Sequence, residues 1–178
     1  MKRILLLILI IILVGFLVGC DGLHDQDLYN LNGFILPSDE GFINLVEELQ
    51  FPRQICQYIH DNFTYEAHFY DVSPYELYQT KKGDCNDFSS FVVFILNYNF
   101  YETYQIAIYY PNSSFLHYIA VFKEGKDKLN FTSNWSYFEI AADNFEEIVN
   151  YLCFIDKKIW SKYIVYDHGM NIVEKREN

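Results

Sequence analysis

The stretch that decides the fold reads Lys82-Gly83-Asp84-Cys85-Asn86-Asp87-Phe88-Ser89. A helix is predicted to begin here, because Asp84 is a good N-cap residue and apolar side chains follow it at helical spacing. The side chains that would face a core are Phe88, Phe91, Val92, Ile95 and Leu96. Cys85 then lies in the first turn, where unpaired backbone amides and the helix dipole favour a thiolate. The stretch therefore predicts a cysteine nucleophile at the start of a core-facing helix.

Around this helix the periodicity of the chain changes from helical to extended. Helical spacing predicts further helices over residues 39–50, 52–62, 73–78 and 143–153. Aromatic and β-branched runs predict strands over residues 103–110, 115–122, 129–134 and 159–166, followed by a polar tail over 167–178. Helices first and strands later, without regular alternation, predict an α+β fold in which N-terminal helices pack on an antiparallel sheet.

A catalytic thiol also needs a base within hydrogen-bond reach. Five histidines are present, and His117 alone lies within an apolar strand; the others are His24, His60, His68 and His168. A lone histidine in a strand is more often a packed residue than a catalyst. Asp84 and Asp87 would raise the pKa of a neighbouring thiol, so His117 would have to supply much of the stabilisation of a thiolate.

The base in turn needs a group that orients it. If the hairpin after His117 turns between residues 125 and 126, Asn134 lies directly opposite His117, with Cβ atoms about 5 Å apart. Asn130 would lie about 13 Å along the strand, so Asn134 is the preferred partner. A shift of one residue in the turn would bring Ser133 or Trp135 opposite His117 instead.

These residues resemble the core of the transglutaminase-like superfamily. The resemblance rests on Gly83-Asp84-Cys85 at a helix start, on the preceding segment Ile59-His60-Asp61-Asn62-Phe63-Thr64-Tyr65, and on His117 at the start of a hairpin, and it covers residues 54–137. It implies a papain-like fold and a Cys85-His117-Asn134 triad, with an Asn where this superfamily usually has an Asp. An Asn would orient the imidazole without adding the negative charge that stabilises imidazolium.

An acyl-transfer site also needs donors for the oxyanion of the tetrahedral intermediate. The backbone N–H of Cys85 is one candidate. The second donor would come from upstream, and the sequence leaves Gln79 and Tyr65 open as candidates.

The N-terminus has the layout of a bacterial lipoprotein signal peptide. Met1-Lys2-Arg3 is basic, residues 4–19 are almost purely apolar, and Leu17-Val18-Gly19-Cys20 resembles a lipobox. The predicted organisation is a signal peptide over 1–19, lipid on Cys20, an irregular tether over 20–38 and a transglutaminase-like domain over 39–178. Because several acyl chains on one residue anchor a protein stably, the expected location is the bacterial cell membrane, facing outside the cytoplasm. The alternative is an uncleaved helix with Cys20 as a bystander.

Charge and residue spacing limit the partners. The formal net charge of −11 argues against nucleic acid, whose phosphates would repel the surface. No paired spacing of metal ligands is present, although Cys85, His117 and Asp87 could be imagined together, so we expect no cofactor or metal. Cys56 and Cys153 are expected to be buried thiols, with a disulfide as the alternative.

Two functions follow. The first is a membrane-anchored cysteine enzyme in which Cys85 attacks an amide or ester carbonyl, and hydrolysis of a peptide or cell-envelope amide is favoured over transfer to an amine. The second is an inactive binding or structural lipoprotein that kept the fold. The sequence assigns no oligomeric state.

Overall fold

The computed structural model describes residues 29–31 and 34–178, which form two compact units divided after Asp39. In the first unit, β1 (Tyr29–Leu31) pairs antiparallel with β2 (Phe34–Leu36). These strands lie within the segment expected to be an irregular tether, so that part of the prediction is wrong. The signal peptide and Cys20 lie outside the described residues. Over the described part of the chain, no helix has both the length and the apolar content needed to span a bilayer.

The second unit begins with four helices: α2 (Glu40–Glu48), α3 (Pro52–Asn62), α4 (Pro74–Thr80) and α5 (Cys85–Tyr98). Local sequence explains where they begin. Pro52 and Pro74 occupy first-turn positions that lack a backbone hydrogen-bond partner in any case. The Ser73 hydroxyl accepts from the Glu76 backbone N–H at 3.2 Å, and Asp84 caps α5. All four helices lie where periodicity predicts them.

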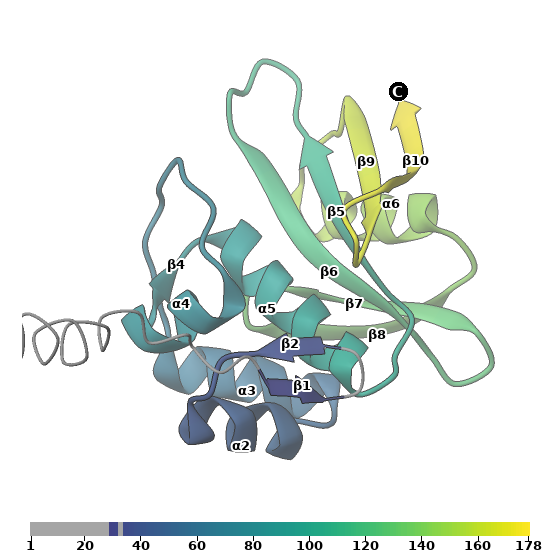
Figure 1. Ribbon diagram of the computed structural model, residues 1–178. Helices are drawn as coiled ribbons and strands as arrows, with labels where there is room; N and C mark the ends of the chain where they lie inside the picture. The colour runs from purple at the N-terminus through teal and green to yellow at the C-terminus, as the bar shows by residue number, and fades with distance from the viewer. Residues whose placement is uncertain (1–28, 32–33) are drawn as a thin grey trace, which may run out of the picture. The chain divides into compact units, whose positions relative to one another are not determined.

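A six-stranded antiparallel sheet follows, in the order β10-β9-β5-β6-β7-β8 (Figure 1). Its strands are β5 (Thr103–Tyr109), β6 (Leu116–Glu124), β7 (Lys128–Ser133), β8 (Ser136–Ala142), β9 (Lys162–Asp167) and β10 (Ile172–Glu177), and α6 (Phe145–Asp156) connects β8 to β9. The expected α+β fold with an antiparallel sheet is confirmed. The prediction that residues 167–178 form a polar tail is wrong, because this segment contains β10, which pairs with β9. The two strands of this sheet that the sequence did not predict, β8 and β10, lie at its edges, and most of their side chains are exposed or only partly buried.

Helices cover both faces of this sheet. On one face, Gln105 of β5 donates through Nε2 to the Ser89 and Ser90 hydroxyls of α5, at 2.7 and 3.1 Å. On the other face, alternate residues of the central strands are buried together with residues of α6: Ile106, Ile108, Ile119 and Val121 from the strands, and Ile148 and Leu152 from the helix. The central strands β5 and β6 are thus buried on both faces, which positions α5 firmly against β6.

The hairpin of β6 and β7 differs in register from the prediction. Ala120 lies opposite Thr132, and Glu124 lies opposite Lys128, so the turn centres on residue 126 rather than between 125 and 126. The extra turn residue allows positive φ angles at both Gly125 and Asp127. The one-residue shift moves Asn134 away from the position opposite His117.

Candidate active site

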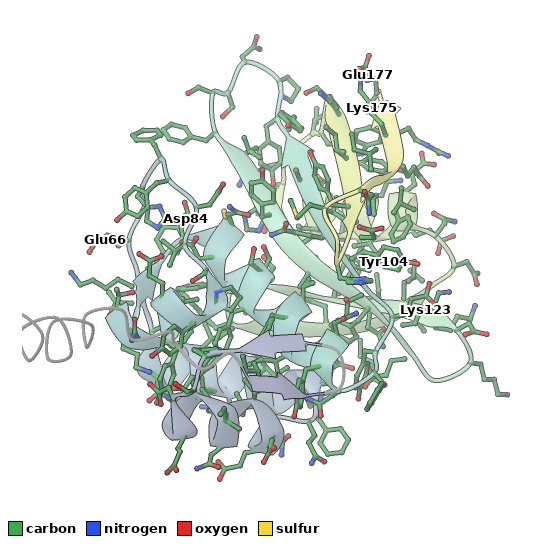
Figure 2. All side chains as sticks on the ribbon, viewed as in Figure 1. Glu66, Asp84, Tyr104, Lys123, Lys175 and Glu177 are labelled. Atoms are coloured by element: carbon green, nitrogen blue, oxygen red, sulfur yellow. The ribbon has the colours of Figure 1, made fainter. Side chains whose placement is uncertain are left out.

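The end of α5 that carries Cys85 meets one end of the sheet. Because neighbouring strands are antiparallel, the last residues of β5 and β7 and the first residues of β6 lie at that same end. Asp84, labelled in Figure 2, marks the start of α5 there. A cavity of about 560 Å³ opens at this point, and its lining includes Tyr65, Cys85, Tyr110, His117, Ser133 and Asn134. The residues predicted to carry chemistry therefore share one cavity, with the exception of Gln79.

The Cys85 thiol is buried, with 8 % of the residue exposed. Burial raises its pKa, and the Asp84 carboxylate adds to that increase. Donors oppose the shift: the sulfur accepts from the backbone N–H of Tyr118 and from the Tyr65 hydroxyl. These donors would stabilise a thiolate once it forms, whereas the resting group is a neutral thiol.

His117 faces the same cavity from the start of β6. Its Nε2 lies 2.8 Å from the Ser133 hydroxyl oxygen at the end of β7. Burial lowers the pKa of His117 to about 4, with the Asp156 carboxylate opposing the shift and Lys158 reinforcing it. The imidazole is therefore neutral at neutral pH. With Nε2 bound to Ser133, Nδ1 is the nitrogen left to accept a proton.

Asn134 does not orient His117 in this structure. It lies with Trp135 in the two-residue turn between Ser133 and Ser136, with φ of 52°, a conformation that Asn tolerates well. Its Oδ1 is buried in the cavity wall without a hydrogen-bond partner. The partner of the imidazole is instead Ser133. The observed register, with Ala120 opposite Thr132, would extend to Trp135 opposite His117, so the shift in the turn does not by itself account for the Ser133 contact.

Asn130, the other candidate left open, has a structural role. Its Oδ1 accepts from the backbone N–H groups of Ile140 and Ala141, at 3.0 and 2.9 Å. Its Nδ2 donates to Glu124 at 3.0 Å. These bonds fasten β8 to β7 where their register shifts, and they leave no polar atom for His117.

The two oxyanion candidates separate clearly. Tyr65 lies in β3 (Thr64–Tyr65), which pairs in parallel with β4 (Lys82–Gly83), the strand just before Cys85. Its hydroxyl oxygen accepts from the Cys85 backbone N–H and its proton points to the sulfur. Gln79 lies exposed in α4 and does not line the cavity. Only Tyr65 is placed where an oxyanion donor is needed.

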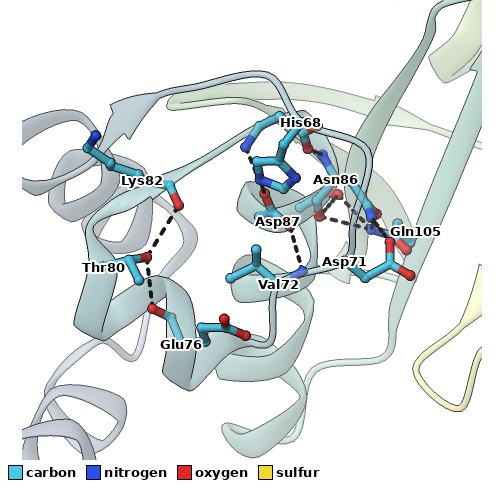
Figure 3. A network of polar contacts seen from close by, with 11 residues as sticks. His68, Asp71, Val72, Glu76, Thr80, Lys82, Asn86, Asp87 and Gln105 are labelled. Carbon is cyan, nitrogen blue, oxygen red and sulfur yellow. Dashed lines mark hydrogen bonds and ion pairs between the residues drawn. The ribbon is translucent and has the colours of Figure 1, made fainter.

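A buried carboxylate holds the start of α5 in place (Figure 3). Asp87, 1 % exposed, accepts from the backbone N–H of Asp84 at 2.7 Å and of Val72 at 3.1 Å. His68 Nε2 lies 2.8 Å from the same carboxylate, although the contact lacks hydrogen-bond geometry. Asp87 therefore ties the loop before α4 to the first turn of α5. Sequence reasoning placed Asp87 near the thiol but missed His68, which stands in a loop without a periodic signal.

Among the described residues, His68, Asp84 and Asp87 place one ligand atom each within 4.8 Å of one another. Cys85 and His117 are not members of this group. The oxygens of Asp84 and Asp87 already accept backbone hydrogen bonds at the start of α5, so the group is explained by its role in capping the helix.

Fold and site together define an α+β protein with a cysteine at a helix N-terminus and a histidine on the adjoining strand. Residues 44–126, which include Cys85 and His117, match the family model of the transglutaminase-like superfamily. The chain therefore contains a transglutaminase-like core, and the resemblance drawn from its sequence is confirmed. The matched segment ends before Ser133 and Asn134.

Solved structures show the same fold at low sequence identity. LapG of Legionella pneumophila is 13 % identical over 75 % of this chain and 77 % of its own, with a TM-score of 0.50. Its EGTA-treated form is 12 % identical over 78 % and 79 %, also with a TM-score of 0.50. A proposed cysteine protease from Cytophaga hutchinsonii is 13 % identical over 57 % of this chain and 41 % of its own, with a TM-score of 0.45, so this chain spans less than half of that protein. No curated protein sequence matches the chain.

Proposed function

We propose that the chain is a cysteine hydrolase that cleaves an amide bond in a peptide or cell-envelope substrate, with Cys85 as nucleophile, His117 as base and Ser133 as the group that positions His117. The observation that carries the proposal is the 2.8 Å contact between His117 Nε2 and the Ser133 hydroxyl in the cavity that also holds Cys85. The Ser133 hydroxyl can accept from Nε2 or donate to it; in the tautomer in which Nε2 carries the proton and donates to Ser133, Nδ1 is the free base that the reaction uses.

The proposed reaction uses these groups in order. The Cys85 thiol transfers its proton to His117 Nδ1 as the sulfur attacks the carbonyl carbon, and the oxyanion accepts from the Cys85 backbone N–H and the Tyr65 hydroxyl. Protonated His117 gives that proton to the leaving amine when the C–N bond breaks. Water, deprotonated by His117, then attacks the thioester; the C–S bond breaks, the acid is released, and His117 returns its proton to the Cys85 sulfur. Attack by an amine at the second step would give transfer instead.

The neutral state of both groups supports a second candidate, a binding protein that kept the fold. The pKa of Cys85 is raised and that of His117 is lowered to about 4, so the resting pair is thiol and imidazole rather than thiolate and imidazolium. Ser133 also brings no charge to the site. An enzyme would have to form the charged pair in the presence of substrate.

One experiment separates the two candidates. The protein is treated with an acetyl-Ala-Ala-Ala chloromethyl ketone at pH 7, and the alkylation of each cysteine is followed by mass spectrometry. Cys56 and Cys153 are free and buried in the structure, so they are internal controls. If the chain is a hydrolase, Cys85 should be alkylated at least tenfold faster than Cys56 or Cys153, and His117→Gln should remove this difference in rate. Equal rates at the three thiols, or full reactivity in His117→Gln, would contradict it.

The membrane anchor is a separate part of the proposal. The lipobox-like Leu17-Val18-Gly19-Cys20 supports lipid attachment at Cys20 and a location outside the cytoplasm. Metabolic labelling with a lipid precursor tests it, because the wild-type chain should incorporate label and Cys20→Ala should not. Label retained by Cys20→Ala would exclude this anchor.

A further inference from the structure

The cavity has a second wall that the proposed reaction does not use. Tyr110 follows β5, and Asn134 lies in the turn between β7 and β8. The Tyr110 hydroxyl and Asn134 Oδ1 are two of the buried side-chain atoms, within the described residues, that have no hydrogen-bond partner. Both line the cavity that contains Cys85.

Unpartnered buried polar atoms need an explanation, since each costs about 1–3 kcal/mol of stability. Turn geometry accounts for Asn134 in part, because its φ of 52° favours Asn or Gly. It does not account for Tyr110. The ring of Tyr110 packs under the Lys158 ammonium at 4.7 Å, a contact that a Phe ring would also make. The hydroxyl adds only an unsatisfied group unless a ligand binds it.

The chemistry of the two atoms describes the ligand. An Asn Oδ1 only accepts, so it requires an N–H or O–H, whereas a tyrosine hydroxyl can donate to a carbonyl. One peptide backbone offers both. The charged side chains that line the cavity are Asp156 and Lys158, one of each sign, and His117 is neutral at neutral pH because burial lowers its pKa. A neutral amide therefore matches the cavity better than a phosphate or a carboxylate.

We propose that Asn134 and Tyr110 form a subsite for the substrate backbone, with Asn134 accepting an N–H and Tyr110 donating to a C=O next to the scissile bond. The inference rests on the proposed function, because the same cavity must place a carbonyl carbon against Cys85. It assigns to Asn134 a role in substrate binding in place of the expected role in orienting His117.

The test compares two chloroketones that share a reactive group. Chloroacetone reports the thiol alone, and acetyl-Ala-Ala-Ala chloromethyl ketone adds a peptide backbone. The quantity measured is the ratio of their alkylation rates at Cys85, in which changes to the thiol itself cancel. Asn134→Gly keeps the positive φ and removes the acceptor, and Tyr110→Phe removes only the hydroxyl. Asn134→Asp keeps an acceptor oxygen, and Lys126→Ala, exposed at the opposite end of the sheet, is the matched surface control.

We expect the ratio of the peptide chloroketone rate to the chloroacetone rate to fall about 2- to 10-fold in Asn134→Gly and in Tyr110→Phe, because each variant loses one hydrogen bond to the peptide. Asn134→Asp should retain more of the ratio than Asn134→Gly, and Lys126→Ala should match the wild type. A ratio unchanged in both Asn134→Gly and Tyr110→Phe overturns the subsite while leaving Cys85 as nucleophile.

If Cys85 proves inert to both reagents, the proposed hydrolase fails and a binding measurement decides the subsite. Cys85→Ala is titrated with acetyl-Ala-Ala-Ala-amide by NMR, alone and combined with Asn134→Gly or Tyr110→Phe. Weaker binding in both combined variants supports the subsite. Equal affinity in all three proteins, or no binding in Cys85→Ala, overturns it.

Discussion

Replacing Ser133 by Asp should increase the reactivity of Cys85. The Ser133 hydroxyl lies 2.8 Å from His117 Nε2, so a carboxylate at this position would lie within ion-pair distance of the ring. A negative charge stabilises imidazolium and therefore raises the pKa of His117. Ser133 has no charge to offer, and burial is the main cause of the lowered pKa of about 4, with Asp156 opposing it and Lys158 adding to it.

The expected gain in the reactivity of Cys85 follows from the expected rise in the pKa of His117. An opposite charge at this distance raises a pKa by about 1–3 units, and each unit corresponds to about 1.4 kcal/mol. The pKa of His117 would rise from about 4 to about 5–7. The population of the thiolate–imidazolium pair should rise about 10- to 1000-fold. Burial of the new carboxylate opposes this gain, so an increase of at least tenfold in the alkylation rate is the expected result.

The assay is the pH dependence of Cys85 alkylation by chloroacetamide, with the pKa of His117 followed by NMR. Ser133→Asn is the matched control, because it keeps a polar partner without adding charge, and its rate should stay within about threefold of wild type. The double variant Ser133→Asp, His117→Gln should show no gain. A folded Ser133→Asp protein that reacts within twofold of wild type would refute the reasoning.

Three further predictions concern stability. The pKa of His117 is about 4 in the folded protein, against 6.5 for the unperturbed group. Between these pH values the unfolded chain binds more protons than the folded one, so the free energy of unfolding should fall by about 3 kcal/mol as the pH drops from 6.5 to 4. Urea titrations should show this pH dependence in the wild type and not in His117→Phe. Asp87→Ala leaves two backbone amides without their acceptor and should cost about 2–4 kcal/mol in the same assay; a loss under 0.5 kcal/mol would remove Asp87 as the anchor of the helix start. Gly83→Ala would place a Cβ 2.8 Å from side-chain atoms of Asp87 and Leu77 and should cost about 1–3 kcal/mol by thermal melting, whereas Gly169→Ala, whose nearest neighbour is an exposed side chain at 3.1 Å, should melt close to wild type.

The helical half of the fold could be predicted from sequence because its signals are local. The apolar stripe of α5 and the caps at Ser73 and Asp84 each fall within a few residues, and the helices begin where those residues indicate. The edge strands β8 and β10 carry no such stripe. Their place in the sheet depends on pairing with β7 and β9, which a local pattern does not report.

Of the three residues of the proposed site, Cys85 and His117 could be predicted from the sequence, and Ser133 could not. Cys85 and His117 are marked by a helix start and an apolar strand, both local features. The partner of His117 depends on the register of β6 and β7 and on how the two-residue turn at Asn134 and Trp135 places Ser133, and the local sequence reports neither. Tyr110 and His68 carry no local signal at all, because only the fold brings a strand end and a loop toward the start of α5.

The two ends of the sheet differ in how much change in chain length they can accept. The turn at residues 125–127 is exposed and lies far along β6 from His117, so added residues there should be accommodated as in any surface loop. The turn at Asn134 and Trp135 has only two residues, and it fixes Ser133 beside His117 while Trp135 contacts Phe88 of α5. A single inserted residue at this turn would move these side chains to new positions together. Among homologous chains, insertions should therefore collect in the first turn and be absent from the second.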